Sequence, residues 1–262
     1  MMRRRSSLGR FVWLALLVII VSAVTFWFRH LSQKTVATIP DVIIVGTSAD
    51  YPPFSFKENG KIVGFDIDVA KEICRRLNKQ IEIKDVPFEL LIPQLQQGYL
   101  HFVAAGISPN PERARLVTFT HSYSISNPLV VLSLAPYGPL FKTPADLNKK
   151  RVIINQGYNT ETFASTLKGA TIIRLPTIAD AIKALQDKSA DVFITAINTI
   201  PPIFNQFGKE HFSFFVIPET NENIAIAMSP RYPLLEQEVG FTVNKILQDG
   251  TLDELKQKWQ IQ

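Results

Sequence analysis

Short, unbroken runs of Val, Ile and Leu recur along this chain, and they restrict its fold more than any other feature. Val42 to Val45 and Val152 to Ile154 are two examples. Such runs are typical of strands buried on both faces, as in parallel sheets covered by helices. Stretches with apolar residues at helical spacing separate them, which predicts an α/β fold. We expect strands at 42–45, 81–86, 101–106, 129–133, 152–154, 171–175, 191–194, 214–217 and 224–228, and helices at 66–77, 88–97, 161–167, 177–186, 234–247 and 252–259.

The order of these elements predicts two lobes joined by two crossings. The strand at 129–133 would carry the chain into a second lobe, and residues 219–223 would form the return hinge. We expect the first lobe to comprise 41–126 and 222–262, and the second 127–221. Hinged lobes bind ligands between them, because closure lets both lobes contribute polar groups and expels water.

The N-terminus carries an apolar segment with a basic flank. Phe11 to Phe28 contains no charged residue, a length suited either to a marginal membrane span or to the core of a signal peptide. Trp27 and Phe28, followed by Arg29, favour an anchor that stays in the bilayer. We therefore expect an anchor or signal peptide at 1–30, a linker at 31–40, and the rest of the chain outside the cytoplasm.

Charge and composition exclude several classes of function. The formal net charge is +5, but all of it comes from five arginines in residues 1–30, and the remainder has 23 basic and 23 acidic residues. The basic pI thus gives no indication of nucleic-acid binding. One cysteine, Cys74, excludes an internal disulfide, and it falls on the apolar stripe of the helix at 66–77. The four histidines lack metal-ligand spacing, so neither a metal site nor a cofactor is predicted.

Residues 104–113, with the sequence AAGISPNPER, form the most informative polar stretch. Asn110 is a good helix N-cap, Pro111 suits the first helical position, and Arg113 follows in the same turn. With the hydroxyl of Ser108, free backbone N–H groups and the Arg113 guanidinium would form a receptor for a carboxylate. On spacing alone, a loop-to-helix junction with a solvated arginine is the more ordinary interpretation, because isolated N-cap signals are common.

Two further junctions follow from local signals. The loop at 46–54 leaves the carboxyl end of the first strand, where ligands sit in open α/β sheets, so Ser48 and Tyr51 are expected to line a cleft. Residues 56–63 are typical of a hairpin, with an Asn-Gly turn at 59–60. Asp66 is expected to cap the helix that follows.

Several motifs together resemble a known family. GTSADYPPF, GFDIDVAKEI, PFELLIPQLQQG, AAGISPNPER followed by VTFT, and a final DGTLDELKQKW occur in order over residues 41–262. The chain is similar to periplasmic solute-binding proteins of polar amino-acid ABC importers, bacterial extracellular solute-binding protein family 3. The resemblance implies a type II periplasmic-binding-protein fold, with a mixed sheet flanked by helices in each lobe.

The resemblance also implies roles for individual residues. Arg113 and Ser108 would hold the ligand α-carboxylate, and Gly106 would offer its carbonyl to the α-ammonium group. Tyr51 and Phe88 would enclose the ligand side chain. The turn at 156–160 would form the opposite wall, where Asn159 and Thr160 would meet the carboxylate as the lobes close.

The sequence departs from this family at two positions. Relatives carry an Asp that pairs with the ammonium group where this chain has Ala196. A buried ammonium without a counter-ion costs several kcal/mol. Either another acid compensates, with Glu161 or Asp50 as candidates, or the ligand is not an ordinary α-amino acid; Asn198 is a possible polar substitute. Ser48 stands where an acid or amide often meets a polar side chain, which leaves recognition of a basic ligand open.

Three functions are compatible with these features. The favoured one is binding of a small carboxylate-bearing solute, an amino acid above all, for delivery to an ABC permease on the periplasmic face of the membrane. A membrane-tethered ligand sensor is an alternative. An enzyme resembling cyclohexadienyl dehydratase would need a general acid or base such as Glu161 or His121, but no catalytic motif supports it, so a non-enzymatic protein is predicted.

Overall fold

The computed structural model describes residues 38–123 and 127–261. The anchor or signal peptide expected at 1–30 lies outside these residues and stays a prediction. From Ile39 onward the described residues form one compact unit. Within them, no helix combines the length and the apolar character that crossing a bilayer requires.

The first lobe is built on a mixed five-stranded sheet with the order β5-β1-β6-β13-β7. β1 runs parallel to β5 and β6, whereas β13 is antiparallel to β6 and β7. β13, which comes from near the C-terminus, therefore lies between β6 and β7 and joins them into one sheet. Its strands are β1 (Val42–Thr47), β5 (Gln80–Asp85), β6 (Phe102–Val103), β7 (Thr118–Phe119) and β13 (Ala227–Met228).

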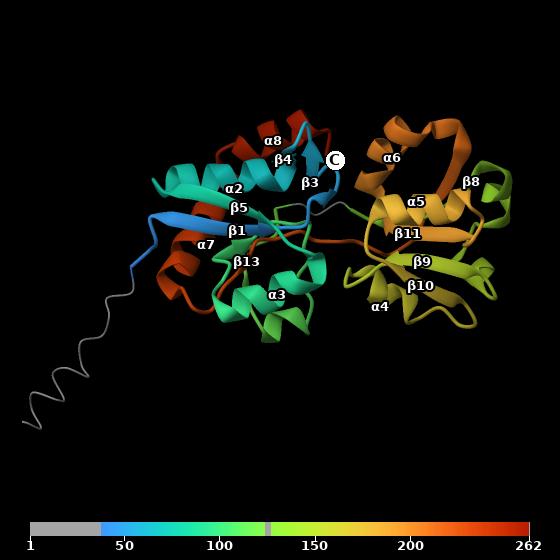
Figure 1. Cartoon of the computed structure of the whole chain (residues 1–262), viewed down its shortest axis with the longest axis horizontal. Coiled ribbons are helices and arrows are strands. Elements are labelled where there is room, and N and C mark those ends of the chain that lie inside the picture. The colour runs from blue at the N-terminus through green and yellow to red at the C-terminus, as the bar shows by residue number, and fades with distance from the viewer. Residues whose placement is uncertain (1–37, 124–126, 262) are drawn as a thin grey trace, which may run out of the picture. The chain divides into compact units, whose positions relative to one another are not determined.

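Helices cover both faces of this first sheet. In Figure 1, α2 and α3 lie on opposite sides of β1. α2 packs with α7 and α8, while α3 contacts β1 and β6. The helices are α2 (Phe65–Arg76), α3 (Phe88–Gln97), α7 (Pro233–Gln248) and α8 (Thr251–Trp259), and a small sheet of β2 (Asp50–Tyr51), β3 (Ser55–Glu58) and β4 (Lys61–Val63) contains the expected hairpin.

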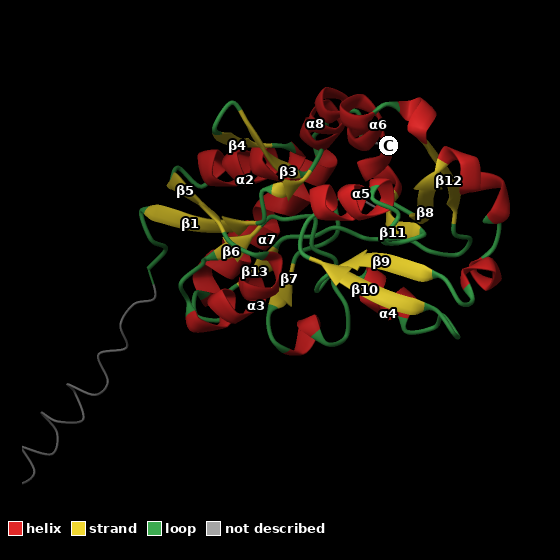
Figure 2. Ribbon diagram, turned by 45° about the vertical axis from the view of Figure 1, so that its right-hand side comes forward, coloured by secondary structure: helices red, strands yellow, loops and turns green. Residues whose placement is uncertain are grey.

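The second lobe repeats this plan with a sheet of order β10-β9-β11-β8-β12. β9 is parallel to β10 and β11, and β8 is antiparallel to β11 and β12. Figure 2 shows these strands with their helices. The elements are β8 (Leu129–Leu134), β9 (Arg151–Asn155), β10 (Thr171–Leu175), β11 (Val192–Ala196), β12 (Phe212–Val216), α4 (Thr160–Ala164), α5 (Ile178–Gln186) and α6 (Ile200–Phe207). The mixed sheet expected in each lobe is present, and the lobe boundaries remain a prediction.

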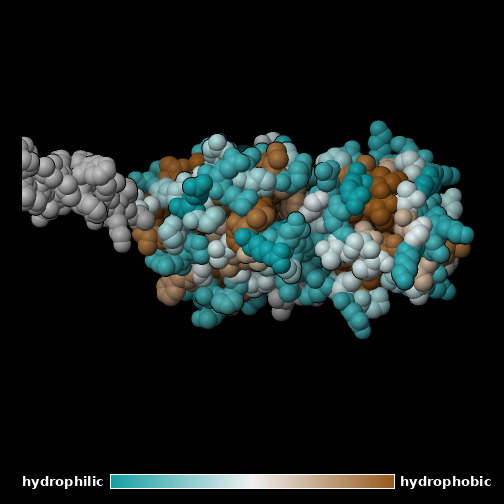
Figure 3. Space-filling model, turned by 90° about the horizontal axis from the view of Figure 1, so that it is seen from below, coloured by the Kyte–Doolittle hydropathy of each residue, from teal (hydrophilic) through white to brown (hydrophobic). Residues whose placement is uncertain are grey.

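Burial explains why the apolar runs signalled the fold. Every residue of β11 is buried, and Ile43 and Val45 of β1 are fully buried. At the sheet edge, β5 alternates between half-buried Ile81 and Ile83 and exposed polar residues. Figure 3 shows the result on one face of the molecule, where hydrophobic residues reach the surface in separate patches among hydrophilic ones.

The prediction that Asp66 caps α2 is wrong. Gly64 is the N-cap, and the first N–H groups of the helix donate to backbone carbonyls: Phe65 to Pro53 and Asp66 to Phe54, both at 2.9 Å. Because the preceding loop satisfies these donors, the Asp66 side chain is free to turn into the core. It is fully buried there.

The α-helix expected after Asn110 is also wrong. The chain forms only a 3₁₀ turn at Arg113–Arg115 and then enters β7. Asn110 still caps this turn, since its Oδ1 accepts a hydrogen bond from the Arg113 N–H at 2.8 Å. A regular helix N-terminus therefore does not contribute to anion binding here.

Two expected strands are shorter than predicted, since only 102–103 and 227–228 pair as strands. Gly106, with φ of +60°, turns the chain soon after β6.

Candidate functional site

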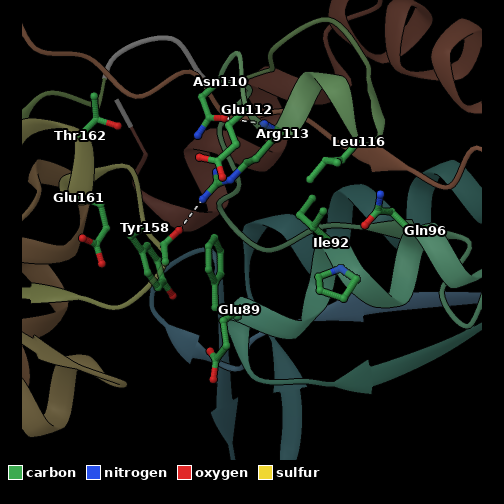
Figure 4. A pocket seen from close by; sticks show the side chains of 13 residues that line it. Glu89, Ile92, Gln96, Asn110, Glu112, Arg113, Leu116, Tyr158, Glu161 and Thr162 are labelled. Carbon is green, nitrogen blue, oxygen red and sulfur yellow. Dashed lines mark hydrogen bonds between the residues drawn. The ribbon is translucent and has the colours of Figure 1, made fainter.

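The candidate site lies where loops from the two lobes meet. A cavity of about 480 Å³ is lined by Phe88, Glu89 and Arg113 from the first lobe and by Tyr158 and Glu161 from the second. Figure 4 shows Arg113 and Tyr158 facing each other across it. The loops of Arg113 and Tyr158 follow β6 and β9, so the site lies at the carboxyl ends of strands, as predicted for an open α/β sheet.

Arg113 is the main charged group of this site. Its side chain is buried, with Nη1 donating to the Ser108 carbonyl at 2.8 Å and Nη2 to the Gly157 carbonyl in the second lobe at 2.6 Å. The guanidinium also lies 5.3 Å from the centroid of the Phe88 ring. No carboxylate of the described residues comes within 4.0 Å of it. Burial lowers the pKa of Arg113, and most of its side-chain N–H donors have no acceptor among the described residues. A buried cation in this condition is suited to receive an anion.

Three buried polar atoms lack any hydrogen-bond partner among the described residues. They are Ser108 Oγ in the first lobe, Thr160 Oγ1 in the second, and Asn127 Nδ2 at the crossing between them. Leaving such a group unsatisfied costs roughly 1–3 kcal/mol. Two of the three belong to residues that the sequence assigned to a ligand carboxylate, so their orphaned state indicates a polar molecule that completes the site.

The aromatic part of the site contains a residue that the sequence analysis missed. Tyr51 and Phe88 are both buried, and Tyr158 is packed against both rings. It stacks on Phe88 at a centroid distance of 4.0 Å and lies tilted against Tyr51 at 5.3 Å. An aromatic residue directly after Gly157, in the turn that leaves a buried strand, was the available signal.

Gly106 holds the first-lobe loop against Tyr51. A Cβ at this position would lie 2.6 Å from Tyr51 Cε1, so no larger residue fits without displacing the ring. The Gly106 N–H donates to the Asp66 carboxylate, which also accepts from the Tyr123 hydroxyl at 2.9 Å. Burial raises the pKa of Asp66 to about 7, against the lowering effect of these two hydrogen bonds. Asp66 is therefore a fixed internal support of the Gly106 loop.

Acidic residues gather near the rings of Tyr51, Phe88 and Tyr158, which together are called the aromatic slot. Ser48 Oγ donates to Asp50 Oδ1 at 2.8 Å. Burial raises the pKa of Asp50, and the nearby charges of Asp85 and Glu89 raise it further. Asp85 is bound by Lys57 at 2.7 Å, which leaves Asp50 and Glu89 as acids with no cation within 4.0 Å among the described residues.

The second-lobe residues expected at the site differ in their surroundings. Asn159 Oδ1 accepts a hydrogen bond from Asn110 Nδ2 at 3.2 Å, which links the two lobes at the surface. Thr160 is buried in the first turn of α4.

The candidates for acid and base catalysis do not come together. Glu161 is bound by Arg174 at 2.9 Å, and His121 Nδ1 lies 2.6 Å from Asn244 Oδ1 on α7. The pairing of Glu161 with Arg174 also argues against Glu161 as the acid that replaces the one missing at Ala196. Within residues 38–123 and 127–261, no three His, Cys, Asp or Glu side chains are grouped as a metal site.

Comparison with known proteins identifies the family. The family "bacterial extracellular solute-binding proteins, family 3" matches residues 43–262. The chain belongs to this family. The resemblance found in the sequence motifs is thereby confirmed.

Relatives and solved structures of this family agree in fold. The chain is 30% identical over 225 residues to the arginine-binding extracellular protein ArtP of Bacillus subtilis (strain 168), covering 83% of this chain and 85% of that protein. It is similar, at a TM-score of 0.77 and 31% identity, to a substrate-binding protein of an amino acid ABC transporter, covering 84% of this chain and all (100%) of that one. These matches confirm the two-lobed fold.

A third similarity bears on the enzymatic alternative. The ancestral amino acid-binding protein AncCDT-1, a precursor of cyclohexadienyl dehydratase, matches at a TM-score of 0.75 and 30% identity, covering 84% of this chain and 95% of that one. The protein in that structure is described as an amino acid-binding protein, so this similarity concerns a binding protein of the solute-binding family.

Proposed function

We propose that this protein binds an α-amino acid between its lobes and delivers it to an ABC importer on the outer face of the membrane. The observation that carries the proposal is Arg113, a buried guanidinium with no carboxylate partner among the described residues. A ligand carboxylate can accept two parallel hydrogen bonds from such a group. Ser108 and Thr160, one from each lobe, add the hydroxyl donors that lack partners.

A basic side chain suits the opposite end of the site. Asp50 and Glu89 lie near each other and near Tyr158, since both raise the pKa of the Tyr158 phenol. A ligand cation placed there would relieve the repulsion between these acids. Ser48 is hydrogen-bonded to Asp50, so the acid is displaced by two positions from the place where relatives would carry it. The arginine-binding relative in Bacillus subtilis supports the same choice, and L-arginine is the first ligand to test.

Tyr158 occupies the space proposed for the ligand side chain. Its ring is 4.0 Å from Phe88 and 5.3 Å from Tyr51, the two residues expected to enclose that side chain. We therefore expect the ligand side chain to displace the Tyr158 ring from its place beside Phe88 and Tyr51. The ligand carboxylate then replaces the Gly157 carbonyl as the acceptor of the Arg113 hydrogen bond. The second lobe then closes again with Asn159 and Thr160 on the ligand.

The transport partner and location follow from the family. A solved relative is the binding protein of an amino acid ABC transporter, which supports an ABC permease as the partner of this chain. An apolar N-terminal segment with a basic flank supports a position outside the cytoplasm, tethered by an uncleaved anchor.

Arg113→Ala tests the proposed function. Removing the guanidinium leaves the buried ligand carboxylate without its partner, so we expect a loss of about 2–5 kcal/mol in the binding free energy of L-arginine. Isothermal titration calorimetry on the full chain measures this loss. Arg115→Ala is the matched control, because Arg115 is exposed in the same 3₁₀ turn.

The control sets the criterion for failure. Arg115→Ala is expected to change the dissociation constant by less than about threefold, as is usual for an exposed charge. Equal affinities of Arg113→Ala and the wild type for L-arginine would overturn the proposal. Melting curves of both variants without ligand show whether either change disturbs folding.

A further inference from the structure

We propose that Glu222, in the return crossing between the lobes, supplies the carboxylate that pairs with the ligand α-ammonium group. The assignment rests on the proposed function, since it requires an amino acid in the cleft. It answers the question raised by Ala196, where the sequence lacks the acid that relatives use. Neither the family description nor the sequence motifs point to Glu222.

Asn127 places Glu222 next to the position of the missing acid. The Glu222 N–H donates to the Asn127 carbonyl at 3.1 Å, and the N–H of Asn198 donates to Asn127 Oδ1 at 3.2 Å. Asn198 follows Ala196, the last residue of β11, by two positions. The two crossing segments thus bring Glu222 close to the end of the strand from which relatives would present their acid.

Glu222 and Arg113 lie near enough to interact through their charges, but they do not form an ion pair. Each affects the pKa of the other through its charge, yet no salt bridge within 4.0 Å joins them. The Tyr158 phenol is affected by the charges of both. A cation and an acid separated in this way match the two charges of an amino-acid head group, with its carboxylate on Arg113 and its ammonium on Glu222.

The surroundings of Glu222 provide no other cation. The side chain is only 5% exposed, and within the described residues it has no Lys, Arg or His within 4.0 Å. Burial raises the pKa of Glu222 to about 7, although the Arg113 charge and the Tyr51 hydroxyl both act to lower it. A bound ammonium group would stabilise the ionised form at physiological pH. Asn127, whose carbonyl accepts the Glu222 N–H, has a buried Nδ2 with no hydrogen-bond acceptor within 3.5 Å among the described residues.

The acids first considered for this role are engaged elsewhere. Glu161 forms an ion pair with Arg174 at 2.9 Å, and its side chain remains 31% exposed. Asp50 accepts the hydroxyl of Ser48 and lies with Asp85 and Glu89. Of these three acids, Glu222 is the one that interacts with Arg113: the Arg113 charge acts to lower the pKa of Glu222, and the Glu222 charge acts to raise the pKa of Arg113.

The test compares L-arginine with 5-guanidinopentanoate, which lacks the α-amino group but keeps the carboxylate and guanidinium. Both are titrated by calorimetry into the full-length wild type, Glu222→Gln, Glu161→Gln, and Glu219→Gln as the matched control, because Glu219 is an exposed acid of the same return crossing. We expect the wild type to bind L-arginine about 100-fold more tightly than the analogue. Glu222→Gln is expected to lose most of this preference, weakening L-arginine by about 30-fold or more and the analogue by less than about threefold, because only L-arginine loses a buried charge partner.

The possible results separate the two proposals. A wild type that binds neither compound removes the proposed function and this assignment with it. A wild type that prefers L-arginine, with Glu222→Gln keeping that preference, overturns the role of Glu222 and leaves the proposed function standing. Loss of the preference in Glu161→Gln instead would move the role to Glu161. Near-ultraviolet circular dichroism of each variant checks that its tertiary structure is retained.

Discussion

Asp66 and Glu222 are two buried acids in different regions of the molecule, and they differ in what surrounds them. Asp66, under the Gly106 loop, accepts hydrogen bonds from the Gly106 N–H and the Tyr123 hydroxyl. Glu222, in the return crossing, has the Tyr51 hydroxyl beside it and lies near Arg113, which has no carboxylate within 4.0 Å among the described residues. Burial raises the pKa of both to about 7. The shifted pKa alone therefore does not distinguish a structural acid from a binding acid, whereas the hydrogen-bond partners do.

The largest expected effect comes from removing the supporting acid. Asp66→Ala leaves the buried Gly106 N–H and Tyr123 hydroxyl without an acceptor, so we expect the free energy of unfolding to fall by about 3–5 kcal/mol. Urea denaturation without ligand measures it. A loss below about 1 kcal/mol would show that the two donors find other acceptors and that Asp66 is not a support.

Glu222→Gln is expected to have a smaller effect on the free energy of unfolding. Its sign is opposite to that of Asp66→Ala, so it is stabilising, and its size depends on pH. Because burial raises the pKa of Glu222 from its usual 4.5 to about 7, the folded wild type keeps a proton that the unfolded chain has lost between these values. The stability of the wild type relative to Glu222→Gln therefore falls as pH rises from about 4.5 to about 7, by about 3 kcal/mol, and then levels off.

Denaturation of both proteins at a series of pH values, without ligand, measures this difference. Parallel stability curves from pH 4 to pH 8 would contradict the raised pKa. Saturating L-arginine is expected to reduce the difference, since its ammonium group stabilises the ionised form of Glu222 in the wild type.

The smallest expected effect is a difference between two hydroxyl deletions. Tyr123→Phe removes one of the two donors to Asp66, and a loss of about 1–2 kcal/mol in the free energy of unfolding is expected. Tyr51→Phe removes the hydroxyl near Glu222, a carboxyl that the proposal reserves for the ligand, and is expected to cost less than about 0.5 kcal/mol in the ligand-free protein. Thermal melts at pH 6 compare the two. Equal losses of stability in the two variants would contradict the assignment of Asp66 as a supporting acid and Glu222 as a binding acid.

Much of the fold could be predicted from local signals. α3 spans the expected residues 88–97, and Gly98 ends it in the left-handed conformation that glycine adopts readily after a helix. The hairpin turn at Asn59 and Gly60 has the positive φ values that an Asn-Gly pair favours. These features depend on neighbours within a few residues, which is why the sequence alone carries them.

Where a prediction from local sequence was wrong, contacts between residues far apart in the sequence determine the structure. Asp66 has the sequence of a cap, but carbonyls of Pro53 and Phe54 take its place and free the side chain for Gly106. The turn at Arg113 has the sequence of a helix start, yet the chain leaves it to pair β7 with β13. A cap or a short helix contributes about 1 kcal/mol, which is less than the gain from completing a buried sheet.

The sequence by itself determined the α/β class, the family, and the residue types able to hold a carboxylate, because apolar period and ordered motifs are properties of the chain. The tertiary structure alone decided that Tyr158 packs against Phe88 and Tyr51, that Arg174 engages Glu161, and that Glu222 lies near Arg113. Such relationships join residues 13 to 109 positions apart. Their energies depend on distance and on exclusion of water, and neither quantity exists until the chain is folded.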